Sequence, residues 1–149
     1  MATQTHNGEF SLTTTGTELS EGKRYWEVEL LSKKKGWILI GISRPNLNPT
    51  REYYRRACTD SWFINASYGA LCGNGKEGHE GAGACEQGDR VGVLLDLDNG
   101  SLRFFKNGVE HGPGYPAGSV TGPVVAAVQM CYKDSSVRLL PNAEAPADV

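Results

Sequence analysis

The chain of 149 residues has the length of one domain and is too short for two ordinary ones. Hydrophobic residues make up 39% of it, and its 19 glycines and 7 prolines stay below the share found in low-complexity chains, so composition excludes a disordered protein. Fifteen basic and 17 acidic side chains give a formal charge of −2, which argues against a dedicated nucleic-acid-binding protein, because such domains usually carry a strongly basic face.

Alternating polar and apolar residues predict strands along most of the chain. Residues 24–30 place Trp26, Val28 and Leu30 on one face and polar residues on the other, which is typical of a strand with one wet face. Residues 37–43 are apolar on both faces and rich in β-branched residues, as expected of a central strand. Further strands are predicted at 61–65, 91–97, 102–104, 124–132 and 136–140.

Two Asn-Gly pairs, at 99–100 and 107–108, predict hairpin turns of type I′, because both central residues of that turn need a positive φ. Helical spacing is absent, and at most a short turn of helix is expected at 52–56. We therefore expect one all-β domain over residues 1–149, an antiparallel sandwich or barrel with its core at about 8–141 and a flexible tail at 142–149.

The chain shows neither an export signal nor a membrane span. No window holds 18 consecutive apolar residues, and the polar start lacks a basic and an apolar stretch. The four cysteines are unclustered in a chain that is long enough to build a core unaided. We expect reduced thiols, no membrane association and an intracellular protein, cytoplasmic or nuclear.

Motifs that bind cofactors or metals are weak. Residues 73–78 match GxGxxG, but no helix pattern follows to hold a pyrophosphate, so a glycine loop is favoured over a nucleotide site. Residues 96–100 resemble the start of a calcium loop, but the later ligand positions do not fit and a hairpin is favoured. Cys72, His79 and Cys85 are possible zinc ligands without paired spacing, and a fourth would come from afar, for example from Cys58. We expect no metal and no cofactor.

Catalysis is not indicated either. Nucleophilic catalysis needs a base within reach of a nucleophile, and the three histidines lie in a polar tail, a glycine-rich loop and a post-hairpin turn. The carboxylates lie on wet strand faces or in turns, without an apolar pocket to raise the pKa of one of them. We expect no enzyme.

The segment 44–56 (RPNLNPTREYYRR) is the most suggestive binding candidate. Its four arginines and one glutamate give a charge of +3, and it contains two adjacent tyrosines and two prolines. Tyrosine and arginine are enriched where partners bind, and proline stiffens a loop so that less entropy is lost on docking. The alternative is an ordinary solvated loop with one tyrosine tucked into the core.

The chain resembles the SPRY domain family. The resemblance rests on residues 22–29 (GKRYWEVE), 37–43 (WILIGIS), 61–65 (SWFIN) and 88–108, where GDRVGVLLDL is followed by LRFFKNG. These blocks occur in the family's order and cover about 22–141. The segment 8–17 is too short for the upstream PRY half of the tripartite-motif and butyrophilin proteins, so a SPRY-only version is indicated.

The resemblance implies a bent antiparallel two-sheet β-sandwich that has no catalytic activity and binds peptides or proteins through loops at one end. Such modules often select targets for ubiquitin ligases or act as adaptors in signalling and chromatin complexes. The family's binding loops map onto residues 44–56, the loop at 68–83 and the segment 129–133. The partner-binding candidates are Arg44, Pro45, Arg51, Tyr53, Tyr54, Arg55, Tyr68, Gln129, Met130 and Tyr132.

We therefore expect a monomeric interaction module that docks a short segment of an intracellular partner. Arginines of the segment 44–56 would pair with partner carboxylates, and Tyr53 or Tyr54 would supply apolar area, which favours an acidic or Asp/Asn-containing motif. The rival interpretation is a carbohydrate- or small-ligand-binding sandwich, with Trp62, Tyr68 and Tyr132 as stacking platforms. Their positions in or beside strands favour core packing instead.

Overall fold

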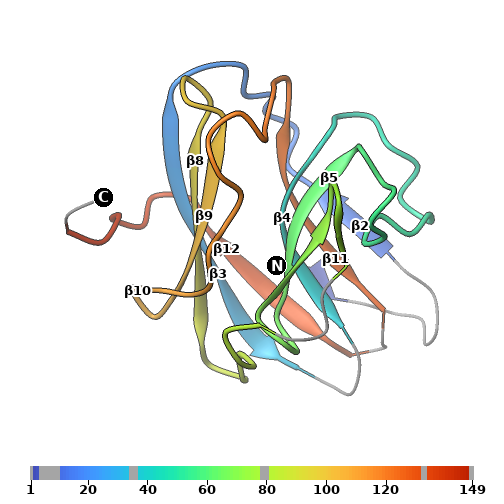
Figure 1. Cartoon of the computed structure of the whole chain (residues 1–149). Helices are drawn as coiled ribbons and strands as arrows, with labels where there is room; N and C mark the ends of the chain where they lie inside the picture. The colour runs from blue at the N-terminus through green and yellow to red at the C-terminus, as the bar shows by residue number, and fades with distance from the viewer. Residues whose placement is uncertain (1, 4–10, 34–36, 78–80, 132–133, 148–149) are drawn as a thin grey trace.

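Two antiparallel sheets packed face to face make up the fold (Figure 1), in a computed structural model that describes residues 2–3, 11–33, 37–77, 81–131 and 134–147. The strand order is β1-β12-β3-β8-β9-β10 in sheet A and β2-β11-β4-β5-β6-β7 in sheet B. None of the described residues is helical. The predicted all-β sandwich is confirmed.

Sheet A consists of β1 (Ala2–Thr3), β12 (Ser136–Leu140), β3 (Lys23–Ser32), β8 (Arg90–Asp96), β9 (Ser101–Lys106) and β10 (Val109–Glu110). Sheet B consists of β2 (Ser11–Thr14), β11 (Val125–Met130), β4 (Ile38–Ser43), β5 (Ser61–Asn65), β6 (Ala70–Gly73) and β7 (Lys76–Glu77). All the predicted strands are present, with ends shifted by up to two residues. The short strands β1, β2, β6, β7 and β10 were not predicted.

The main core lies between the two sheets. The predicted inward face of β3, from Trp26 to Leu30, is buried there, opposite Ile40 and Ile42 of β4. Each large apolar side chain that is fully removed from water contributes about 1.5–3 kcal/mol. β4 lies between β11 and β5, and all six of its residues are buried, so the central strand predicted from its two apolar faces is confirmed.

The two predicted type I′ turns have different outcomes. Asn107 and Gly108 have φ of 50° and 84° and join paired residues of β9 and β10, which confirms the turn there. At the other pair only Gly100 has a positive φ. Its amide donates to the Asp96 carbonyl (2.7 Å) within a four-residue connection between β8 and β9. The prediction of a two-residue turn at 99–100 is wrong, because a wider loop closes this hairpin.

The glycine-rich segment 73–78 begins as a hairpin. Asn74 and Gly75 have φ of 47° and 90°, and Gly73 pairs with Lys76, which is the geometry of a type I′ turn between β6 and β7. A dinucleotide fingerprint needs a helix N-terminus after its glycines, whereas a strand begins at Lys76. The GxGxxG match is therefore a turn sequence.

Candidate partner-binding surface

Residues 44–60 form a strap that connects β4 to β5 and lies on the outer face of sheet B (Figure 1, teal). The Arg44 amide donates to the Asp60 carbonyl (2.8 Å) and closes the base of the strap. A second apolar cluster forms beneath it, separate from the core between the sheets. Its buried members are Leu12, Leu39, Tyr53, Phe63, Cys72 and Ala127.

A buried amide holds the middle of the strap. Gln129 on β11 has no exposed surface. Its Oε1 accepts a hydrogen bond from the Tyr53 amide (2.9 Å), and its Nε2 donates to the Arg51 carbonyl (2.6 Å). The Leu12 amide of β2 donates to the Pro49 carbonyl (2.8 Å). The structure therefore places Gln129 beneath the strap as an anchor, whereas the sequence analysis expected a partner contact there.

Tyr53 is the second anchor. Its side chain is 6% exposed, and its hydroxyl donates to the Asn48 carbonyl (2.9 Å) within the strap. Its own carbonyl accepts a hydrogen bond from Ser61 Oγ. Burial raises the pKa of the Tyr53 hydroxyl. Of the two tyrosines, Tyr53 is the one that faces inward, and it leaves little apolar area for a partner.

The sequence allowed at most a short turn of helix at 52–56, and the structure has none there. In a helical turn the Arg51 carbonyl would accept from the Arg55 amide, but here it accepts from Gln129 Nε2 instead. The backbone instead bends at residue 51 and again at 55–57, where the Cys58 amide donates to the Arg55 carbonyl (3.0 Å).

Arg44 is a clamp between two loops. Its Nη1 donates to the carbonyls of Thr121 and Pro123 (3.1 Å to the latter), and its Nη2 donates to Thr121 Oγ1 (2.8 Å). The guanidinium also lies 5.0 Å from the centre of the Trp62 ring. Because these donors are already engaged, Arg44 is poorly placed for the bidentate pairing with a carboxylate that the sequence analysis expected.

The outward side of the strap is charged. Arg51, Glu52, Arg55 and Arg56 are exposed. Arg55 Nη2 lies 3.3 Å from Glu52 Oε2, whereas in the described part of the chain neither Arg51 nor Arg56 has an ion-pair partner. Three arginines against one glutamate leave a positive surface that the predicted residues Arg51 and Arg55 share.

Three aromatic residues from three segments meet beside this charged surface. Trp37 precedes β4, Tyr54 belongs to the strap, and Tyr68 lies in the turn between β5 and β6. The Trp37 ring contacts Tyr54 and Tyr68 edge to face, with ring centres 4.9 and 6.5 Å apart. Arg55 lies over the Tyr54 ring at 5.2 Å. The structure therefore brings together three predicted residues, Tyr54, Arg55 and Tyr68.

Trp37 is the member of this surface that the sequence analysis missed. It was read as part of a buried strand, yet its side chain is only half-buried. In the alternation of β4 it shares a face with Leu39, which lies beneath the strap rather than between the sheets. A strand that is apolar on both faces signals a second covering layer, and this pattern was the available clue.

The remaining candidates are scattered. Met130 is 1% exposed and belongs to the core between the sheets. Pro45 is half-buried and lines a small cavity with Thr14 and Leu47. Trp62, named for the rival ligand-binding interpretation, is 2% exposed and donates from Nε1 to the Ser119 carbonyl (3.0 Å). Tyr132 lies outside the described residues.

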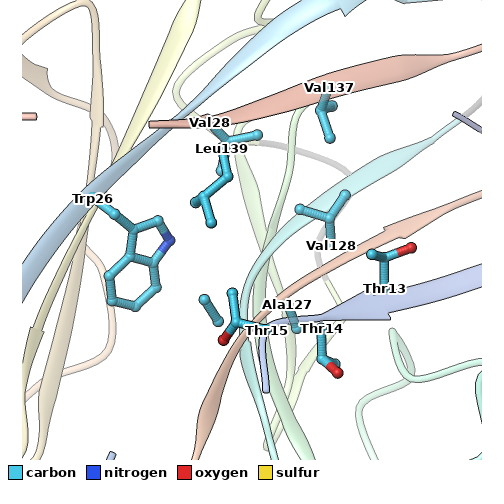
Figure 2. A pocket seen from close by; sticks show the side chains of 10 residues that line it. Thr13, Thr14, Thr15, Trp26, Val28, Ala127, Val128, Val137 and Leu139 are labelled. Atoms are coloured by element: carbon cyan, nitrogen blue, oxygen red, sulfur yellow. The ribbon is translucent and has the colours of Figure 1, made fainter. Parts of the chain in front are cut away.

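An apolar groove opens between the sheets at the side of β2 and β12. Figure 2 shows Trp26, Val28 and Leu139 of sheet A and Thr13 and Val128 of sheet B around it. Its volume is about 210 Å³. Among the described residues, none of the side chains that line the groove is ionisable.

The possible zinc ligands are not assembled by the described residues. Cys72 and Cys85 are buried, with Cys72 beneath the strap and Cys85 in the core between the sheets, and burial raises the pKa of the Cys85 thiol. His79 lies outside the described residues. Within the described ranges, no group of three or more histidine, cysteine or acidic residues could hold a metal ion.

Fold and surface together define a two-sheet antiparallel sandwich with a braced, positively charged loop on one outer face. The SPRY domain model matches residues 23–143, and the chain belongs to the SPRY domain family. Among solved structures it is similar to the SPRY domain of human HERC1, with 19% identity, a TM-score of 0.76, and coverage of 93% of this chain and 86% of that one. A human SPRY domain is similar at 26% identity and a TM-score of 0.74, with coverage of 93% and 89%.

A search of curated proteins gives no match. SPRY domains are generally non-enzymatic modules for protein–protein interaction. None of the described residues forms a helix of the length and apolarity needed to cross a membrane. The family expected from the sequence is confirmed.

Proposed function

We propose that this domain binds a short acidic segment of an intracellular partner on the outward side of the strap. Arg51, Arg55 and Arg56 supply the charge, and Tyr54 and Tyr68 supply the apolar area, with Trp37 as an added member. In a larger assembly such a domain serves as the recognition part, either selecting substrates for a ubiquitin ligase or holding a signalling or chromatin complex together.

The observation that carries this proposal is the contrast between the two sides of the strap. Its inward side is fixed by Gln129 and Tyr53, whereas its outward side presents three exposed arginines, one of which, Arg55, lies over a ring of the aromatic cluster. A loop that is already ordered loses little entropy on docking, and arginine and tyrosine are the residues that most often dominate binding energy. A shallow site of this kind supports micromolar affinity, about −8 kcal/mol.

Fluorescence anisotropy with labelled 12-residue peptides tests the proposal. One set carries aspartate, glutamate and Asp-Asn pairs, and a matched set has the acidic residues replaced by glutamine. We expect only the acidic set to bind, and we expect added salt to weaken binding because exposed charges are screened. Arg56→Glu should weaken the best peptide about tenfold, which corresponds to about 1.4 kcal/mol.

Arg24→Glu is the matched control, because Arg24 is an exposed arginine on β3 of the opposite sheet. The same change of charge there should leave the affinity unaltered. Equal loss in both variants would mean that only the overall charge of the domain matters. Equal affinity of acidic and glutamine peptides would refute the acidic segment as the ligand.

A further inference from the structure

A histidine from the other sheet's hairpin braces the turn that carries Tyr68. His111 directly follows β10, and its amide donates to the Phe104 carbonyl of β9 (2.9 Å), which fixes its backbone to sheet A. Its side chain is only 9% exposed. Its Nε2 lies 2.8 Å from the carbonyl oxygen of Gly83. Since a carbonyl oxygen can only accept, Nε2 carries the proton and donates.

Further hydrogen bonds connect Gly83, the residue bonded to His111, with the turn that carries Tyr68. The Gly83 amide donates to the carbonyl of Tyr68 (3.0 Å), and the neighbouring Ala82 amide donates to the carbonyl of Gly69 (3.2 Å). Residues 82–83 thus hold the peptide unit next to Tyr68, and the His111 imidazole holds residues 82–83. The other end of the turn is closed by Asn65, whose carbonyl accepts from the Gly69 amide (2.7 Å).

The fit at Gly69 shows how closely the imidazole packs. A Cβ on Gly69 would lie 2.8 Å from His111 Nε2 and 2.5 Å from the Gly83 carbonyl oxygen, both closer than real contacts allow. The ring and the 82–83 segment therefore occupy the space where a side chain would stand. The position of the turn depends on this contact between the two sheets.

We propose that His111 is a positioning residue for Tyr68, which it places against Trp37 through Gly83. This inference rests on the proposed function, because it matters for binding only if Tyr68 belongs to the contact surface. His111 itself touches no partner. Its loss lets the turn move, so the aromatic cluster has to be re-ordered whenever a partner docks.

A double-mutant cycle with the best acidic peptide tests the proposal. We expect His111→Ala to weaken binding about fivefold, the effect of one lost hydrogen bond. In a Tyr68→Ala background the same change should have no further effect, because the residue it positions is gone. His111→Gln, whose amide reaches the place of Nε2, should restore binding, whereas the shorter His111→Asn should not.

A second measurement needs no ligand. Amide hydrogen exchange at Gly83 and Ala82 should become faster in His111→Ala and return toward the wild-type rate in His111→Gln, with the thermal midpoint recorded to confirm that each variant is folded. Unchanged exchange at both amides in folded His111→Ala would overturn the brace, whatever the peptides do.

The binding results separate this inference from the proposed function. Loss of equal size in the wild-type and Tyr68→Ala backgrounds would overturn the role of His111 as a positioning residue for Tyr68. Wild-type affinity of Tyr68→Ala together with weak binding by Arg56→Glu would leave the acidic site standing and overturn the inference. Failure of every acidic peptide to bind would remove the proposed function, and faster exchange would then support only the structural brace.

Discussion

Replacing Gln129 by alanine removes both side-chain hydrogen bonds that hold the strap to β11. The amide of Tyr53 would be left buried without its acceptor, which costs about 1–3 kcal/mol. The carbonyl of Arg51 is only partly buried and regains water, so its lost bond costs about 0.5–1.5 kcal/mol. We expect Gln129→Ala to lower the free energy of unfolding by about 1.5–4.5 kcal/mol, a large share of the 5–15 kcal/mol typical of a domain.

Urea unfolding followed by tryptophan fluorescence measures this loss, because a pure change in stability moves the midpoint and keeps the slope. Trypsin cleavage after Arg51, Arg55 and Arg56 reports on the strap alone. We expect cleavage there to accelerate in Gln129→Ala under native conditions, because the strap is released before the sandwich opens. Thr13→Ala is the matched control on neighbouring β2, where the side chain is exposed and the strap is not contacted through it.

Gln129→Glu separates the two bonds. Its carboxylate still accepts from the Tyr53 amide, but it cannot donate to the Arg51 carbonyl and brings a charge to a fully buried position. Destabilisation of both variants with slow tryptic cleavage would show that Gln129 supports the sandwich rather than the strap. A wild-type midpoint and wild-type cleavage for Gln129→Ala would refute the assignment of Gln129 as an anchor.

Two further predictions concern polar groups elsewhere in the fold. Tyr115→Phe should lower the free energy of unfolding by about 1–3 kcal/mol in urea titrations, because the single proton of the buried hydroxyl is shared between the carbonyls of Cys72 (2.7 Å) and Gly73 (3.0 Å). The backbone amide of Glu86 holds the pKa of Asp89 below its ordinary value of 3.8. The ionised carboxylate therefore stabilises the fold above about pH 4, and this contribution is lost as the pH falls through the lowered pKa. Asp89→Asn should be less stable than wild type at pH 7, and the gap should close in acid-unfolding curves below pH 4; a constant gap would contradict the lowered pKa.

β3 was predictable because its side chains alternate between the core and the wetter face, and β4 because it is apolar on both faces. The same patterns could not find β2, whose run of polar Ser and Thr residues has only Leu12 buried, or the short strands β6, β7 and β10, which owe their existence to hairpin partners. The Asn-Gly pair at 107–108 correctly predicted a type I′ turn. The pair at 74–75 forms the same kind of turn, but it was not used as a turn signal in the sequence analysis.

The basic, tyrosine-bearing segment could be singled out from the sequence as a binding candidate, but the placement of its individual side chains could not. The two adjacent tyrosines look alike in the sequence. Tyr53 faces inward because its backbone is bonded to Gln129 and Ser61, which are distant in the sequence or on another strand, and Tyr54 is left on the outer side. Arg44 was read as a free cation because nothing near it in the sequence shows that the carbonyls of residues 121 and 123 lie within reach. Long-range pairing of this kind is invisible to local patterns.

Within a few positions of the strap, some residues fix the backbone and others are exposed to solvent. Tyr53 and the glutamine below it fix the backbone path, while positions 51, 52, 55 and 56 point into solvent. Under the proposed function, substitutions at the solvent positions alter which polypeptide is recognised at little cost to folding. Duplicated copies of such a domain are free to diverge in specificity while their sandwich stays the same.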